Sequence, residues 1–152
     1  VSTIIEQVVS GSCEIGILPY AFADKRLLVV PFLREQLSVC VPNNHPLARE
    51  KTLTFEQING FNCLVRDQLG FWSNLCHEKM PASKFLVQTD AFALEELIRS
   101  STLLCFTTNL AGWEEQEVLQ DRTIIPLVDK EATAAYQLIC LPKNKGLLKP
   151  YI

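Results

Sequence analysis

The side chains with the most reactive chemistry in this sequence are two histidines and six cysteines. Cys76 and His77 are adjacent and could begin a metal site or a thiol nucleophile, but no further His or Cys stands at ligand spacing from them. The other histidine, His45, lies in a proline-bounded turn elsewhere in the chain. The sequence has no GxSxG elbow, phosphate loop or GxGxxG segment. We therefore predict that the chain is not an enzyme and uses neither a metal nor a cofactor.

The cysteines favour a structural role. They stand at positions 13, 40, 63, 76, 105 and 140, and no two have CxxC spacing. At least four lie within apolar runs such as SVCV and LICL, where cysteine behaves as a small buried hydrophobic residue. We interpret all six as reduced thiols, which is typical of a cytoplasmic protein.

Polar turns between predicted strands and helices offer a different chemistry, the binding of a small anion. Such turns occupy residues 66–68, 89–90 and 107–109. In α/β sheets the carboxyl ends of strands and the adjacent helix N-termini face one crevice, where backbone amides attract an anion. Arg66 is the best single candidate for a carboxylate partner, because its planar guanidinium can bind with two parallel hydrogen bonds.

Each of these turns also has a simpler interpretation. Thr89, Asp90, Thr107 and Asn109 are common helix-capping residues, and capping alone could explain any one of them. Arg66 could instead form a surface ion pair, for example with Asp67. The occurrence of three such turns favours the ligand interpretation, and both interpretations stay open.

The elements that would position these turns alternate along the chain. Apolar spacing predicts helices over residues 2–10, 71–79, 91–101 and 110–119, and Thr54 with Gln57 forms a capping box for a short helix that Gly60 ends. Strands are predicted over residues 13–18, 27–33, 35–41, 61–65, 85–87, 103–106, 123–127 and 136–141, and a final helix from Gly146. This alternation predicts α/β layers with mainly parallel sheets.

Residues 35–48 form a strand followed by a rigid turn. Pro42 and Pro46 fix their own backbone and lack an amide hydrogen, so the strand cannot continue past them. An apolar strand that ends at such a turn predicts a crossing between two lobes. His45 is then a turn residue.

Composition excludes several classes of protein. The 152 residues are 48% hydrophobic and 20% charged with a net charge of −3, so a sizeable core is expected. No basic cluster is longer than Lys25-Arg26, which argues against a nucleic-acid-binding surface on this chain. No apolar run reaches the ~18 residues of a membrane span. Without a visible leader or an initiator Met, we interpret the chain as a piece of a longer protein.

The sequence resembles the effector-binding domain of LysR-type transcriptional regulators. Gly11 with Cys13-Glu14-Ile15-Gly16-Ile17 is similar to the family's G-x-x-D-(I/L)-(G/A)-I element, with Glu14 in place of the usual Asp. Residues 33–41 are similar to its L-x-x-E-x-L-x-(L/V)-x-V strand, and residues 45–48 are its HPLA turn. Residues 97–108 match only in outline, with Ser101 and Leu103 in place of two glycines.

This resemblance implies an α/β, two-lobed, type-2 periplasmic-binding-protein-like fold with two crossing strands. Residues 1–41 with 135–152 would form the first lobe, which is incomplete because a strand, a helix and a strand would precede Val1. Residues 42–134 would form the second lobe. The family's effector-binding cleft between the lobes would correspond to Ser2, Thr3, Leu18, Pro19, Tyr20, Arg66, Asp67, Gln68, Thr89, Asp90, Ala91 and Thr107.

The resemblance also implies a mechanism. A small metabolite, which we expect to be an organic anion, would shift the population of lobe arrangements and so modulate DNA binding and transcription. The regulator would be a cytoplasmic homodimer or tetramer, without membrane contact, that binds DNA only through a winged-helix segment absent from this chain. One alternative is a transporter's solute-binding protein, which six apparently unpaired cysteines disfavour. An enzyme on the same fold is disfavoured by the lack of a catalytic set.

Overall fold

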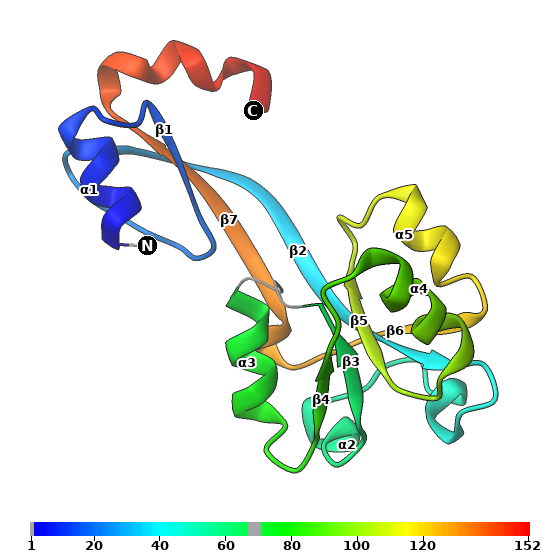
Figure 1. Cartoon of the computed structure of the whole chain (residues 1–152). Coiled ribbons are helices and arrows are strands. Elements are labelled where there is room, and N and C mark those ends of the chain that lie inside the picture. The colour runs from blue at the N-terminus through cyan, green and yellow to red at the C-terminus, as the bar shows by residue number, and fades with distance from the viewer. Residues whose placement is uncertain (1, 67–70) are drawn as a thin grey trace. The chain divides into compact units, whose positions relative to one another are not determined.

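Helices and strands alternate along most of the chain in a computed structural model, which describes residues 2–66 and 71–152 (Figure 1). The chain divides into two units. Unit 1 comprises Val1–Glu35 and Thr133–Ile152, and unit 2 comprises Gln36–Ala132. The chain passes from unit 1 to unit 2 within strand β2 (Leu28–Pro42) and returns at the start of strand β7 (Thr133–Cys140).

Unit 1 is a small sheet covered on both faces. Strand β1 (Ile15–Leu18) pairs antiparallel with β7, and β7 lies beside β2. Successive side chains of a strand point to opposite faces, which explains two separate apolar clusters. Helix α1 (Ser2–Ser10) packs Val8 against Leu18 and Ile139 on one face. The 3-10 helix η3 (Pro142–Tyr151) packs Leu148 against Leu138 and Cys140 on the other.

Unit 2 is built around the second half of β2. This strand pairs antiparallel with β5 (Cys105–Thr108) on one side and with β6 (Arg122–Pro126) on the other. Strand β3 (Cys63–Val65) pairs in parallel with β4 (Phe85–Val87), and a parallel bridge between Cys63 and Leu104 places β3 beside the start of β5. The helices of this unit are α2 (Phe55–Ile58), α3 (Phe71–Lys79), α4 (Ala91–Ser100) and α5 (Trp113–Val118), with 3-10 turns η1 (Pro46–Arg49) and η2 (Lys130–Ala132).

Local signals in the sequence predicted several elements correctly. The helix over residues 2–10 is confirmed, although Thr3, whose T-x-x-E spacing with Glu6 predicts a capping box, lies inside it and does not cap it. The capping box before α2 is also confirmed: the Gln57 amide donates to Thr54 Oγ1 at 3.2 Å, and the Thr54 amide donates to Gln57 Oε1 at 2.9 Å. Asp90 caps α4 as its residue type suggested.

Three expectations about longer elements were wrong. The strands predicted over 27–33 and 35–41 are one strand, because the fixed φ of Pro31 is compatible with extended backbone. The sheets are not mainly parallel: three pairings with a described register are antiparallel and one is parallel. The C-terminal helix is a 3-10 helix that begins at Pro142, where the missing amide hydrogen costs nothing.

Candidate functional site

The site residues predicted in unit 1 lie at the start of α1 and the end of β1. Ser2 and Thr3 are the first residues of α1, and the Thr3 side chain is exposed. Leu18 is fully buried in the core beside Val8, so only its backbone could contact a ligand. Pro19 and Tyr20 follow the strand, and Tyr20 keeps 44% of its surface exposed.

The predicted residues near β3 and α4 have different roles in unit 2. Arg66 follows β3 with an exposed side chain, and it forms no ion pair with any residue the structure describes. Asp67 and Gln68 lie outside the described residues. Thr89 is exposed. Asp90 Oδ1 accepts a hydrogen bond from the Ala93 amide at 2.8 Å, so capping explains this carboxylate.

Thr107 stands out in the third predicted turn. Its side chain is only 7% exposed, and its hydroxyl has no hydrogen-bond partner among the described residues. Buried polar atoms in proteins almost always have a partner. By contrast, Thr108 Oγ1 accepts from the Leu110 amide, and Asn109 Oδ1 accepts from the Gln36 amide at 2.7 Å. Thr107 is therefore the residue of this turn whose side chain has no structural hydrogen bond in the described part of the chain.

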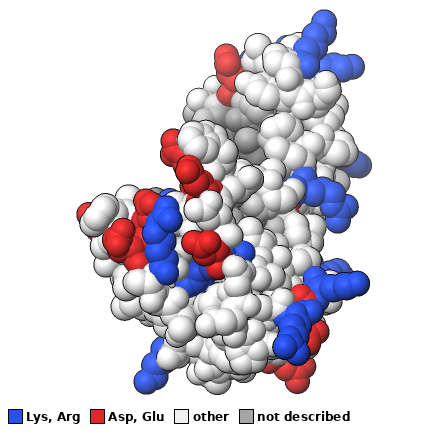
Figure 2. Space-filling view, turned by 90° about the vertical axis from the view of Figure 1, so that its right-hand side faces the viewer, with Lys and Arg blue, Asp and Glu red and all other residues white. Residues whose placement is uncertain are grey.

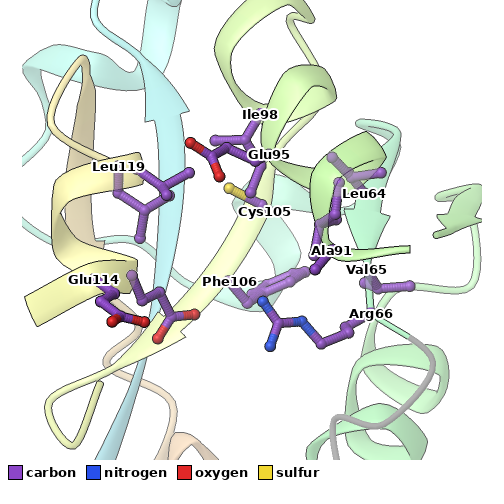
Figure 3. Close-up of a pocket in the computed structure, with 13 residues that line it drawn as sticks. Leu64, Val65, Arg66, Ala91, Glu95, Ile98, Cys105, Phe106, Glu114 and Leu119 are labelled. Carbon is purple, nitrogen blue, oxygen red and sulfur yellow. The ribbon is translucent and has the colours of Figure 1, made fainter. Parts of the chain in front are cut away.

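A hollow of ≈ 480 Å³ in unit 2 brings Arg66 and Ala91 together with residues that the sequence did not indicate (Figure 3). Strands β3 and β5 form its floor and helices α4 and α5 form its walls. Small-molecule sites span roughly 300–1,000 Å³ and combine an apolar lining with a few polar groups. The apolar lining here includes Leu64, Leu94, Ile98, Phe106 and Leu119.

The polar lining of the hollow is Arg66, Glu95, Glu114 and Glu115. Glu95 accepts a hydrogen bond from Arg99 Nη2 at 2.9 Å, one helical turn further along α4. Glu114 and Glu115 lie in the first turn of α5 and form no ion pair with the described residues. In Figure 3 Arg66 and Glu114 lie on opposite sides of the hollow with Phe106 between them. The sequence indicated only a short acidic helix here, because nothing local shows which acids face a hollow.

Arg122 holds the segment between α4 and β5, and therefore one wall of the hollow and part of its floor. The residue is only 8% exposed, and its guanidinium donates hydrogen bonds to four backbone carbonyls. The distances are 3.0 Å to Ile98 O, 2.9 Å to Ser101 O and 3.3 Å to Cys40 O, and the fourth acceptor is Leu103 O. A cation at the C-terminus of a helix satisfies carbonyls that the helix itself leaves free.

Two cysteines face each other at the floor of the hollow. Cys105 lines the hollow and is paired across β2 and β5 with Cys40. A hydrogen bond from the Cys40 thiol lowers the pKa of Cys105, and the same bond together with burial raises the pKa of Cys40. Burial raises the pKa values of Cys63 and Cys76 to about 12. All six cysteines are free thiols.

Neither histidine belongs to a reactive group. Cys76 is buried, and the His77 ring packs against Phe85 with centroids 4.4 Å apart. His45 Nδ1 accepts from the Leu47 amide at 3.1 Å and caps η1, which confirms its role as a turn residue. Within residues 2–66 and 71–152, no three His, Cys, Asp or Glu side chains could share a metal ion. None of the helices in those ranges has the length and hydrophobicity to cross a membrane.

Comparison with known proteins identifies the family. The family model of the LysR substrate binding domain matches residues 1–146. No curated protein sequence matches the chain significantly. The regulatory domain of MetR from N. meningitidis superimposes with a TM-score of 0.70 at 12% identity, covering 97% of this chain and 70% of that chain.

Two further solved structures have the same fold. A full-length OxyR variant from Pseudomonas aeruginosa gives a TM-score of 0.65 at 11% identity, covering 97% of this chain and 50% of that chain. The effector binding domain of BenM with its effector benzoate gives 0.60 at 14% identity, with 98% and 75% covered. The present chain therefore spans half the length of the full-length OxyR chain.

These likenesses show the type-2 periplasmic-binding-protein-like fold of LysR regulatory domains, which sense ligands and are not enzymes. The family model covers almost the whole sequence, including both units. The chain belongs to the LysR substrate binding domain family.

Proposed function

We propose that this chain senses a small organic anion for a LysR-type transcriptional regulator. The observation that carries the proposal is Arg66, an exposed cation without an ion-pair partner among the described residues, at the border of a hollow with an apolar floor. A guanidinium binds a carboxylate with two charge-assisted hydrogen bonds, while the hollow accepts the apolar part of the same molecule.

The position of Thr107 also favours a binding region at the edge of unit 2 where Arg66 lies. Its hydroxyl, which has no hydrogen-bond partner among the described residues, lies on β5, and β5 runs beside β3, the strand that Arg66 follows. Because the bridge between these strands is parallel, their carboxyl ends lie at one edge of the sheet. Arg66 and Thr107 would therefore lie at the same edge, although Thr107 does not itself line the hollow.

The proposal also includes the remaining predicted contacts: Ser2, Thr3, Leu18 through its backbone, Pro19, Tyr20, Asp67, Gln68, Thr89, Asp90 and Ala91. It divides the chain into one lobe of residues 1–41 with 135–152 and a second lobe of residues 42–134. It further includes a homo-oligomeric regulator in the cytoplasm. DNA would be bound by a segment outside this chain. In support, Lys and Arg side chains do not form a continuous stripe on the face shown in Figure 2, where Asp and Glu lie among them.

Thermal-shift measurements with a panel of organic acids test the proposal. An effector at about 100 times its Kd stabilises the fold by about 2.7 kcal/mol, which raises the Tm by several degrees. We expect at least one carboxylate to do so, and Arg66→Gln to abolish the shift. Arg49→Gln is the matched control, because Arg49 is also exposed in unit 2 but does not line the hollow. A shift that survives Arg66→Gln would show that the site is wrongly assigned.

A further inference from the structure

The lining of the hollow carries more negative than positive charge. Arg66 is its only cation among the described lining residues, and Glu95, Glu114 and Glu115 are its anions. The ion pair with Arg99 neutralises Glu95, which leaves two carboxylates without a described cation. A ligand with only a carboxylate would satisfy Arg66 but would add another negative charge beside Glu114 and Glu115.

Glu115 lines the hollow together with Cys105. The hydrogen bond from Cys40 lowers the pKa of the Cys105 thiol, and the carboxylate of Glu115 acts in the opposite direction. Cys105 is only 5% exposed at the floor, and Glu115 on the first turn of α5 lines the same hollow. Glu114 adds a second carboxylate to the same side (Figure 3).

The floor requires an apolar group. Leu64, Phe106 and Leu119 are nearly or fully buried, yet they border a hollow of ≈ 480 Å³. Leu94 and Ile98 on α4 extend the apolar surface along one wall. Polar substituents in this part of the hollow would lose hydration without gaining a partner.

We propose that this hollow binds an α-amino acid with an apolar side chain in its zwitterionic form. The α-carboxylate binds Arg66, the ammonium group binds Glu114 and Glu115, and the side chain covers Phe106 and Leu64. The inference rests on the proposed function, because it uses Arg66 as the carboxylate partner, and it names the chemical class of the effector. An apolar amine would place a second cation beside Arg66, and an apolar acid would leave both glutamates unpaired. The zwitterion satisfies both sides.

A matched series of three ligands tests this inference by isothermal titration calorimetry on the whole chain. The ligands are L-phenylalanine, 3-phenylpropanoate, which lacks the amine, and 2-phenylethylamine, which lacks the carboxylate. A site that pairs both charged groups rejects analogues that lack either one, so we expect L-phenylalanine to bind at least about tenfold more tightly than both.

Substitutions on α5 test the ammonium side. The double variant Glu114→Gln/Glu115→Gln should weaken L-phenylalanine about tenfold or more and favour 3-phenylpropanoate relative to the wild-type chain. Glu117→Gln is the matched control, because Glu117 is exposed on the same helix but does not line the hollow. Circular dichroism spectra that superimpose on wild type establish that each variant is folded.

The outcomes separate this inference from the proposed function. If 3-phenylpropanoate binds as tightly as L-phenylalanine, and does so through Arg66, the inference of a zwitterionic ligand is wrong and the organic-anion proposal stands. If 2-phenylethylamine binds as tightly as L-phenylalanine, the carboxylate contact is wrong and the inference fails. If none of the carboxylates, amino acids included, binds in a manner that depends on Arg66, both the inference and the proposed function fail.

Discussion

At the scale of single residues, Arg122 stabilises a segment that cannot satisfy its own carbonyls. The segment between helix α4 and strand β5 includes Ser101 and Leu103. The Arg122 guanidinium donates hydrogen bonds to the carbonyls of both residues and to that of Ile98. Among the described residues no carboxylate pairs with Arg122, so its charge is balanced by carbonyl dipoles.

We expect Arg122→Gln to lower the free energy of unfolding by about 3 kcal/mol or more. Each hydrogen bond from a charged donor contributes roughly 1.5–3 kcal/mol, and a glutamine amide cannot reach four acceptors. Denaturation by urea at neutral pH measures the loss. Arg99→Gln, which removes an exposed arginine from α4, should remain close to wild type. A small effect of Arg122→Gln would mean that water replaces the guanidinium.

At the scale of elements, the packing of α1 on β1 depends on a glycine, Gly16, at the contact between them. A Cβ atom at Gly16 would lie 2.9 Å from both Ile139 Cγ1 and Ile4 Cγ2, and 3.0 Å from Val8 Cγ2. These atoms belong to the helix above β1 and to the adjacent strand β7. The absence of a side chain at Gly16 therefore sets how closely the helix approaches the sheet.

Gly16→Ala should destabilise the chain by about 1–3 kcal/mol, the usual cost of forcing one extra carbon into a packed core. Gly146→Ala is the matched control in the same unit, since a Cβ atom at Gly146 would have no neighbouring atom within 4 Å. We expect the control to change stability by less than about 0.5 kcal/mol. Equal unfolding midpoints for the two variants would show that α1 can shift away from β1 at little cost.

Elements whose signals are local in the sequence could be predicted, and those that depend on tertiary contacts could not. Caps are local, so Thr54 with Gln57 and Asp90 were recognised from spacing alone. Strand pairing is not local, and nothing in residues 28–42 indicates that β2 runs antiparallel to β5 and β6. Arg66 was identified because strand-end turns are a general binding geometry, and Ala91 was identified through the family resemblance; both line the hollow. Glu114 and Glu115 were missed because only tertiary packing shows which side of α5 meets the hollow.

At the scale of the whole molecule, buried thiols make the free energy of unfolding depend on pH in the alkaline range. Burial raises the pKa of Cys63 and that of Cys76 to about 12, whereas a thiol in the unfolded chain titrates near 8.5. Between these values the folded chain keeps protons that the unfolded chain has lost. The free energy of unfolding is therefore expected to fall as pH rises above about 9, by up to about 1.4 kcal/mol per pH unit for each such thiol, and to depend little on these groups below about pH 7.5.

Urea titrations under reducing conditions at pH 8, 9.5 and 10.5 measure this dependence. The double variant Cys63→Ala/Cys76→Ala should start from a lower stability, because two buried sulfur atoms are lost, but should lose stability less steeply between pH 9.5 and 10.5. The expected difference in slope is about 1.4 kcal/mol per pH unit for each thiol removed. Gly16→Ala supplies the control, because it lowers stability while both thiols remain, so its slope should match wild type. If the double variant shows the wild-type slope, the two thiols ionise in the folded chain as readily as in the unfolded chain, and burial does not protect them.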